Sequence, residues 1–319
     1  MSVGRAVGLL TGFAADRVFG DPRRHHPVAW FGSAAAALEH HTYRDSRAAG
    51  VVHVSLLVGS AWTCGRLIEK AVPGRYGTAA VTAVATWTVV GGRSLAREGE
   101  TIHAQLLAGD LPAARRQLTH LVGRDTTELG PDEIARATVE SIAENTSDAV
   151  VAPLIAGAVA GVPGLLAYRA ANTLDAMIGH RSERYQRFGW AAARLDDVLN
   201  LVPARVAALL AAVLSHHPRA ALRAWRHDAP GHPSPNAGPV EAAFAGALSI
   251  RLGGTNHYAY GTEHPRIEHR VEMGDGPAPA VADIGRTTRL AERVGLTALI
   301  IAAVISCARR PKRPRPMDR

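Results

Sequence analysis

The feature that most constrains this chain is the uneven distribution of its apolar residues. They gather in blocks separated by polar stretches, at 48–64, 77–92, 149–168, 198–214 and 294–308. Most of these blocks are shorter than the ~20 residues that carry a helix across a bilayer, and Arg205 interrupts one of them. The pattern favours an all-α, polytopic integral membrane protein. A soluble helical protein with buried core helices stays open as the alternative.

A length of 319 residues allows one large domain or two modest ones, and we expect a single integral membrane domain over 1–319. The polar segment 93–148 predicts amphipathic helices outside the bilayer. Helix starts are indicated at Asp110, which precedes Pro112, and at Gly130, which precedes Pro131 and two acids. The helix from the second start should run to about Asp148, and the loop before Asn236 should lead into a small-residue helix. The segment 253–276 is expected to be irregular.

The apolar segment around Pro163 predicts a re-entrant helical hairpin. Apolar arms lie on both sides of the breaker Gly161-Val162-Pro163-Gly164. An arm of about 12 residues is only ~18 Å long, too short to cross a bilayer. In such a hairpin Asp148 and Asp175 would meet on one side of the membrane. A continuous kinked spanning helix is the alternative.

The charge distribution indicates how the chain would sit in a membrane. The chain carries a net charge of +8, and the basic tail 309–319 directly follows the last apolar block. Such a tail fits the positive-inside rule and places the C-terminus in the cytoplasm. A nucleic-acid-binding arm is the weaker reading, because no aromatic residues or known module accompany the charge. We therefore predict no nucleic-acid partner.

Two smaller patterns concern packing. The spacing Gly4, Gly8, Gly12 indicates a helix whose small face packs closely against another membrane helix. A short surface helix is the alternative. Cys64 and Cys307 each lie in an apolar block, far apart in sequence. They are expected to be small buried side chains that form neither a disulfide nor a zinc site.

An acidic stripe is the first candidate for chemistry. Glu140, Glu144 and Asp148 recur every four residues, so on a helix they share one face. Like charges at this spacing destabilise a helix unless a cation lies beside them, and Mg²⁺ prefers such oxygen ligands. A solvated acidic face is the alternative. A Walker-type nucleotide loop is missing from the sequence.

A second acidic group follows at Asp196 and Asp197, with Asn200 one turn later. Ionisable groups at the edge of a membrane segment are costly and usually face a cavity or a partner. Arginines lie close to these acids in sequence, and a guanidinium can grip phosphate or carboxylate with two hydrogen bonds. Any single arginine–aspartate pair could equally be a structural salt bridge.

Taken together, these polar segments resemble the CobD/CbiB family of cobalamin biosynthesis. The resemblance covers most of the chain, from about residue 5 to about residue 260, and becomes loose after Gly254. The matching motifs are Gly20-Asp21-Pro22, His26-Pro27-Val28, Arg124-Asp125-Thr126, Glu140 to Asn145 with Asp148, Tyr168-Arg169, Asn172-Thr173-Leu174-Asp175, Glu183-Arg184-Tyr185, Ala193 to Asp197 with Asn200, Pro203-Ala204-Arg205, Ser234-Pro235-Asn236 and Glu241.

The resemblance implies a multi-pass protein of the bacterial cytoplasmic membrane that acts as an adenosylcobinamide-phosphate synthase. The reaction would be ATP- and Mg²⁺-dependent, with ATP as co-substrate. A propionate of adenosylcobyric acid would be joined by an amide bond to (R)-1-aminopropan-2-yl phosphate. Whether the amine is this aminoalcohol phosphate or ethanolamine phosphate stays open. The lipid bilayer and other membrane-bound enzymes of nucleotide-loop assembly are expected partners.

Residue chemistry assigns roles within these motifs. For catalysis we expect Asp175 as the base, with Glu144 and His26. The metal ligands would be Glu140, Glu144, Asp148, Asp196 and Asp197. The substrate-binding residues would be Arg124, Arg169, Asn172, Arg194, Asn200, Arg205 and Asn236.

Two rival functions remain. Intramembrane prenyltransferases also hold Mg²⁺ and a diphosphate with two Asp-rich segments, but the spacing here departs from their paired Asp-x-x-x-Asp pattern. A non-enzymatic membrane sensor or assembly factor is the other rival. ATP dependence would separate the family reaction from prenyl transfer.

Overall fold

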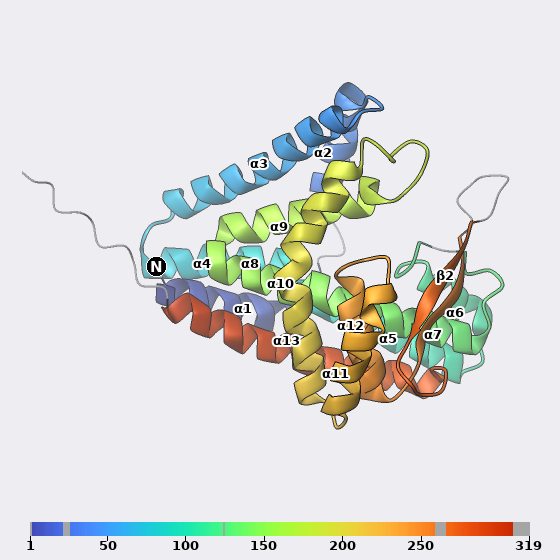
Figure 1. The fold of residues 1–319 in the computed structure, drawn as a ribbon. Coiled ribbons are helices and arrows are strands. Elements are labelled where there is room, and N and C mark those ends of the chain that lie inside the picture. The colour runs from blue at the N-terminus through green and yellow to red at the C-terminus, as the bar shows by residue number, and fades with distance from the viewer. Residues whose placement is uncertain (1, 22–25, 124, 259–265, 309–319) are drawn as a thin grey trace, which may run out of the picture. The chain divides into compact units, whose positions relative to one another are not determined.

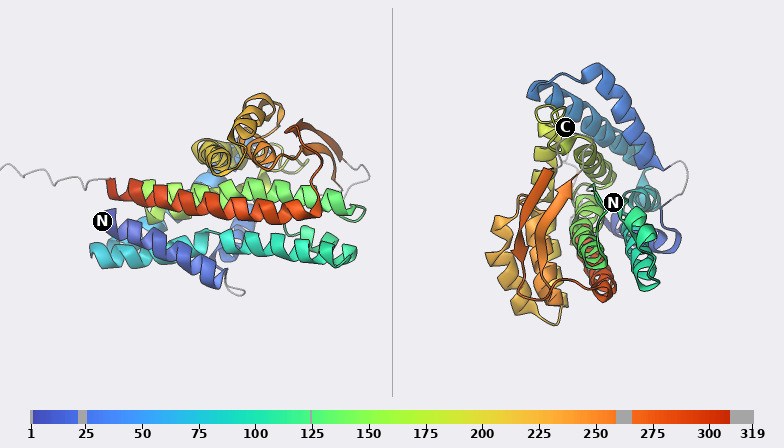
Figure 2. Two further views of the ribbon diagram at one scale, coloured as in Figure 1. Left: turned by 90° about the horizontal axis from the view of Figure 1, so that it is seen from below. Right: turned by 90° about the vertical axis from the view of Figure 1, so that its right-hand side faces the viewer.

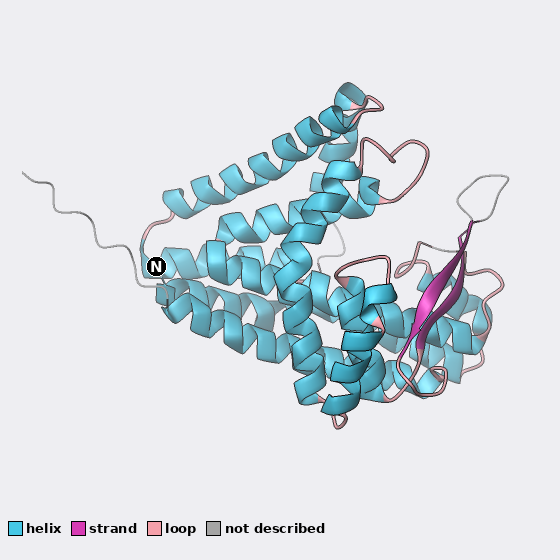
Figure 3. Ribbon diagram, in the orientation of Figure 1, coloured by secondary structure: helices cyan, strands magenta, loops and turns pink. Residues whose placement is uncertain are grey.

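The computed structural model describes residues 2–21, 26–123, 125–258 and 266–308. Helices make up most of the described chain, as the apolar blocks predict, and the strands form one hairpin within it (Figures 1 and 3). The chain divides into two compact units: unit 1 comprises Met1–Val90, Pro153–Ala192 and Leu299–Arg319, and unit 2 comprises Gly91–Ala152 and Ala193–Ala298. The prediction of a single domain over 1–319 stays a prediction.

Unit 1 contains α1 (Ser2–Phe19), α2 (Pro27–Thr42), α3 (Arg47–Ala71), α4 (Gly74–Val89), α9 (Val162–Leu174) and the π-helical segment Asp175–Gly179. Unit 2 contains α5 (Gly92–Leu107), α6 (Leu111–Leu118), α7 (Pro131–Asn145), the π-helical segment Thr146–Val151, α11 (Pro218–His227), a 3₁₀ turn (Ala229–Gly231), α12 (Ala237–Leu248), β1 (Leu252–Tyr258) and β2 (Arg266–Met273). Three helices have residues in both units: α8 (Ala152–Ala160), α10 (Trp190–Leu214) and α13 (Val281–Ala308).

Close packing of α1 on α4 confirms that the glycine face packs against another helix, while its place in a membrane stays a prediction. A Cβ on Gly8 would lie 2.5 Å from the Thr82 Cβ, and one on Gly12 would lie 2.5 Å from the Thr86 Cβ. Gly4 meets the start of α4 at Arg75, so the two helices run parallel and side by side (Figure 2). Glycine on every fourth residue lets the two backbones approach closely.

Helix α9 packs along α3 in the opposite direction. A Cβ on Gly65 of α3 would lie 2.6 Å from the Pro163 Cα, and Gly50 touches the Phe188 carbonyl at the other end. The stretch of α3 between these glycines is about 22 Å long at 1.5 Å per residue. The segment after Gly161 therefore follows most of the length of α3.

The helix break predicted around Pro163 is present. Gly161 has φ 73°, which ends α8, and Pro163 lies in the first turn of α9. The Glu69 carboxylate accepts the Val162 amide at 3.0 Å and lies 3.8 Å from the Arg5 guanidinium. The turn thus lies level with the C-terminal end of α3, which ends at Ala71. A re-entrant membrane hairpin is not confirmed and stays a prediction.

Three of the described helices are long and apolar enough to cross a membrane: α3, α10 and α13. They suggest membrane association, while the orientation predicted from the tail 309–319 concerns residues outside the described part. The apolar block 77–92 forms α4, which has 16 residues, and the block 149–168 is divided by Gly161.

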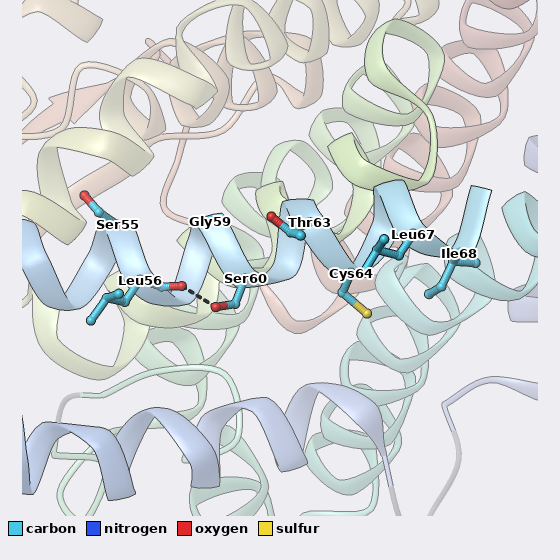
Figure 4. A pocket seen from close by; sticks show the side chains of 8 residues that line it. All are labelled: Ser55, Leu56, Gly59, Ser60, Thr63, Cys64, Leu67 and Ile68. Atoms are coloured by element: carbon cyan, nitrogen blue, oxygen red, sulfur yellow. Dashed lines mark hydrogen bonds between the residues drawn. The ribbon is translucent and has the colours of Figure 1, made fainter. Parts of the chain in front are cut away.

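One side of α3 is open. Ser55, Gly59, Thr63 and their neighbours line a shallow hollow of about 600 Å³ (Figure 4). Cys64 lies in this hollow and is exposed, as is Cys307. The prediction that both thiols are buried is wrong, because each cysteine lies on the outer side of its apolar helix. Both cysteines are free, as predicted.

Unit 2 is built around α12, every residue of which is buried. Helices α7 and α11 and the β1–β2 hairpin pack against α12. The predicted helix starts are confirmed: the Asp110 carboxylate accepts the Ala113 amide at 3.0 Å, and α7 begins at Pro131. Helix α12 follows Asn236, also as predicted.

The prediction of an irregular segment is wrong for 253–258 and 266–273, which form strands, while residues 259–265 lie outside the described part. The mainly helical fold class is confirmed, with this one hairpin added to it among the described residues. Antiparallel strands β1 and β2 pair from Leu252 with Met273 to Tyr258 with Arg266, with an irregularity between Leu252 and Gly254 (Figure 3). Glycines at the start of β1 hid the strand, because glycine is uncommon inside strands. Both glycines have φ 91°, a backbone conformation that glycine tolerates.

The α1–α4 contact gives a stability prediction. In Gly12→Ala the new Cβ would collide with the Ala83 carbonyl oxygen. We expect the free energy of unfolding to fall by about 1–3 kcal/mol, the usual cost of overpacking. Thermal unfolding of the detergent-purified chain measures it. Gly59→Ala is the matched control, because a Cβ there meets nothing within 4 Å, and it should be neutral or stabilising by up to about 1 kcal/mol. Equal melting temperatures for the two variants would contradict the close contact.

Candidate functional site

The structure distributes the candidate residues over the two units. Unit 1 holds His26, Arg169, Asn172 and Asp175, and Arg124 lies outside the described residues. Unit 2 holds the remaining candidates, namely Glu140, Glu144, Asp148, Arg194, Asp196, Asp197, Asn200, Arg205 and Asn236. The prediction that Asp148 and Asp175 lie close together therefore stays a prediction.

Glu140 connects α7 to the β-hairpin. Its side chain is buried, and its Oε1 accepts the Gly253 amide at 2.9 Å. Arg136, one turn earlier on α7, donates to the Gly253 carbonyl. Both backbone polar groups of Gly253 are thus bound by α7 side chains. One oxygen of Glu140 has a structural role, so this residue is less available as a metal ligand than the sequence spacing implies.

Glu144 lies in a different environment one turn later. Its side chain keeps accessible surface, yet enough protein surrounds the carboxyl that burial raises its pKa. The Arg270 guanidinium lowers this pKa, while the negative charges of Asp196 and Glu140 raise it further. Three carboxylates and one arginine therefore influence one another at this point of unit 2, and Glu144 is the one that solvent reaches.

Both Asp148 and Asp175 lie in π-helical segments. Asp148 is in Thr146–Val151, and Asp175 begins Asp175–Gly179, where its carboxylate touches the Gly179 position. Short π-helical turns inserted in α-helices occur frequently at functional sites. Because the π turn changes the residue spacing, the acidic stripe does not continue with α-helical geometry from Glu144 to Asp148.

The second acidic group lies in α10 and is already hydrogen-bonded. Asn200 Nδ2 donates to Asp196 at 2.9 Å, and Arg194 lies 3.3 Å from the Asp197 carboxylate. The Arg194 side chain is 62% exposed, so its ion pair is a solvated one within a single helix. The ion pair with Asp197 gives Arg194 a structural role, and its predicted role in substrate binding stays a prediction.

A loop before α12 also reaches α10. Asn236 Nδ2 donates to the Asp197 carbonyl at 2.8 Å, and its Oδ1 accepts from Arg205 at 2.8 Å. The predicted residues Asp197, Arg205 and Asn236 are therefore brought together by direct hydrogen bonds. Pro203 and Arg205, which interrupt the apolar run in the sequence, lie inside the continuous helix α10.

His26 has a local structural role. It precedes α2, and its Nδ1 accepts the Val28 amide at 3.2 Å. Its Nε2 lies 3.7 Å from the Asp21 carboxylate. The dipeptide His26-Pro27 is thus a helix start, and a catalytic role for His26 stays a prediction.

The predicted metal ligands are Glu140, Glu144, Asp148, Asp196 and Asp197. Among the described residues no three His, Cys, Asp or Glu side chains could together hold a metal ion. The predicted ligands could still serve Mg²⁺ in its commoner arrangement, in which one or two carboxylates share the ion with phosphate oxygens and water. Glu144 fits this use best, because it is accessible and the acids Asp196 and Glu140 lie near it, together with Arg270.

Sequence reasoning missed two features of unit 2. Arg270 was not singled out, because only the hairpin register, which pairs it with Gly254, brings it to the α7 acids. The other is the pair of His232 and Glu241, whose side chains are 2% and 0% exposed and 3.7 Å apart. The sequence did offer a signal for this pair, because Glu241 is an acid within a helix of small apolar residues, where a buried charge needs a partner.

Comparison with known proteins defines the class of this chain. A family model described as "CobD/Cbib protein" matches residues 9–291. "Cobalamin biosynthesis protein CobD" of Mycobacterium tuberculosis is 54% identical, over 96% of this chain and 97% of that protein. Proteins of the same name from Chromobacterium violaceum and Rhodobacter capsulatus are 43% and 41% identical, over 94% and 92% of this chain and 97% and 96% of their own lengths. No solved structure matches.

The structure is that of a mainly helical protein with three candidate membrane spans among the described residues. The family match extends across both units and includes every candidate site residue. The chain belongs to the CobD/CbiB family.

The raised pKa of Glu144 gives a prediction about pH. Ionised Glu144 destabilises the folded protein, and this penalty begins as pH rises through the ordinary value of 4.5 and is complete above the raised pKa. In metal-free buffer, the stability of Glu144→Gln relative to the original chain should therefore increase with pH and shrink toward zero in acid. Thermal unfolding across pH measures this. Glu100→Gln is the control, because that side chain is 52% exposed. A stability difference for Glu144→Gln that does not change with pH would contradict the assignment.

Proposed function

We propose that this chain is an adenosylcobinamide-phosphate synthase of cobalamin biosynthesis. It would join a propionate of adenosylcobyric acid to (R)-1-aminopropan-2-yl phosphate in an ATP- and Mg²⁺-dependent reaction. The observation that carries the proposal is the family match over residues 9–291, whose relatives bear the name of a cobalamin biosynthesis protein. The arrangement of charges in unit 2 supports the same chemistry.

Amide formation from a carboxylate needs an activated acyl group. The propionate would attack the terminal phosphorus of ATP, which releases ADP and gives an acyl phosphate. The amine would then attack the acyl carbon, phosphate would leave, and the amine would lose a proton. The protein must meet two requirements. The first is positive charge and hydrogen-bond donors at the phosphoryl group, and the second is a base at the amine.

Unit 2 contains groups suited to the first requirement. Glu144 and Asp196 are the carboxylates that would hold Mg²⁺. Burial and then the negative charges of Asp196 and Glu140 raise the pKa of Glu144, and a cation would favour its ionised form. When bound, Mg²⁺ would neutralise charge on the phosphates. Arg270, which lowers the Glu144 pKa, would contribute positive charge beside the same carboxylate. Arg124, Arg169 and Arg194 remain proposed phosphate-binding residues.

Asp175 is the proposed base for the amine. It is partly accessible and lies in a π-helical turn, a conformation that often occurs at functional positions. A carboxylate can accept the proton as the nitrogen forms its bond to the acyl carbon. The corrinoid and the aminoalcohol phosphate are the proposed small-molecule partners. The enzyme would bind these substrates at the bacterial cytoplasmic membrane. Other membrane-bound enzymes of nucleotide-loop assembly would use its product there.

The reaction can be tested with membranes that contain the chain. Incubation with adenosylcobyric acid, aminopropanol phosphate, Mg²⁺ and ATP should give a corrinoid that gains the mass of the amine less water, detected by chromatography and mass spectrometry. No product should form without ATP. Glu144→Gln and Asp175→Asn should each lower the turnover by about 100-fold or more.

The matched control is Glu100→Gln, which removes an exposed carboxylate of α5 and should keep full turnover. Product from ethanolamine phosphate alone would change the amine substrate and leave the reaction class intact. A correctly folded, membrane-inserted chain that makes neither product would refute the proposed function.

A further inference from the structure

Two candidate membrane spans begin side by side in unit 1. Helix α3 begins at Arg47 and α10 begins at Trp190. The Arg47 guanidinium lies over the Trp190 ring, 5.2 Å from its centroid. The stacked pair brings the first residues of both helices to the same level of the unit.

A hollow opens beside this pair. It has a volume of about 390 Å³ and is lined by Ser46, Arg47 and Arg187. Two of its three lining residues are thus cationic. The Ser46 hydroxyl is used locally, since it accepts the Ala49 amide at 3.2 Å to cap α3. The guanidinium groups remain the features that a ligand would meet.

The charges around the hollow are positive on balance. Asp45 pairs with Arg187 at 3.6 Å, but both side chains are more than 60% exposed, at 61% and 66%, and such surface pairs are weak. Glu39 is already bound by Arg184 at 2.8 Å. The cationic side chains from 39–47 and 181–187 outnumber the anionic ones by two, five against three: Arg44, Arg47, Arg181, Arg184 and Arg187 against Glu39, Asp45 and Glu183.

An apolar surface continues from the arginines along α3. Val51 lies one turn after Arg47 and is 44% exposed, while Val52 and Leu56 are 53% and 50% exposed. Trp190 is 38% exposed at the edge of this surface. Arginine and tryptophan beside an apolar helix face are typical of the level at which lipid headgroups lie.

We propose that the hollow at Ser46, Arg47 and Arg187 binds the phosphate of an anionic membrane lipid. The acyl chains would follow the exposed apolar side of α3 from Val51 to Leu56. The first residues of α3 and α10 would then lie at the headgroup level of one leaflet. A soluble phosphate could use the arginines but would make no use of the adjoining apolar surface. The proposal does not depend on the reaction proposed above.

The test uses the full chain purified in detergent, with phosphatidylglycerol and phosphatidylcholine of identical acyl chains as probes. Native mass spectrometry measures the fraction of protein that retains each lipid. Phosphatidylglycerol should be retained preferentially. An arginine near a membrane surface contributes about 1 kcal/mol, so the apparent affinity should fall about 5-fold in Arg47→Gln or Arg187→Gln and about 30-fold in the double variant.

The matched control is Arg66→Gln with Arg75→Gln, two exposed arginines, one near the C-terminal end of α3 and one in the first turn of α4. This control should retain phosphatidylglycerol as the original chain does. The proposal fails if both lipids bind equally, if the control loses as much affinity as the double variant, or if the double variant loses none. Displacement of the lipid by an equal concentration of inorganic phosphate would assign the hollow to a soluble phosphate instead.

Discussion

The hydrogen bond from the Gly253 amide to the Glu140 carboxylate is the contact on which the candidate site of unit 2 depends. It joins the middle of α7 to the start of β1, and Arg136 binds the carbonyl of the same glycine. The hairpin register then fixes where Arg270 lies, opposite Gly254. A buried carboxylate is costly unless its oxygens are hydrogen-bonded, so the amide that holds the hairpin also stabilises Glu140. Two acids one turn apart on α7 therefore differ in role: Glu140 is buried and structural, and Glu144 is accessible.

Unit 1 uses a carboxylate in a comparable way. Glu69 accepts the first amide of α9 at the point where Gly161 ends α8, and Arg5 from α1 lies beside it. One buried acid therefore connects three segments that are far apart in sequence. At the other end of α3, Glu39 accepts from Arg184 and from the Tyr185 hydroxyl, at 2.8 and 3.1 Å. These contacts hold the segment that follows Asp175 against α2. The acids of both units thus contribute to the fold as well as to the candidate chemistry.

How much the sequence predicts depends on whether the signal is local. Apolar blocks, proline at the first turn and the Gly4, Gly8, Gly12 spacing are local signals. They predicted a mainly helical fold, the helix starts at Asp110 and Gly130, and a close helix contact along the glycines, without identifying α4 as the partner. The β-hairpin was missed because its first residues are glycines, and the strand is held by contacts to α7 more than 100 positions earlier, as for Glu140 with Gly253. Arg270 was missed for the same reason. The π-helical turns at Asp148 and Asp175 leave no composition signal, since they arise from packing.

The acidic stripe shows why spacing alone does not assign ligands. A four-residue repeat predicts that Glu140, Glu144 and Asp148 are equivalent, and in the structure their surroundings differ. Glu140 is buried and bound to a backbone amide, while Asp148 follows a change to π-helical geometry. Glu144 alone combines accessible surface with a pKa that burial and neighbouring charges raise. Burial and the nearby acids penalise the ionised form of Glu144, and Arg270 offsets part of that penalty. Binding a further cation or a proton would remove more of it, so ligand binding and folding stability are directly coupled at Glu144.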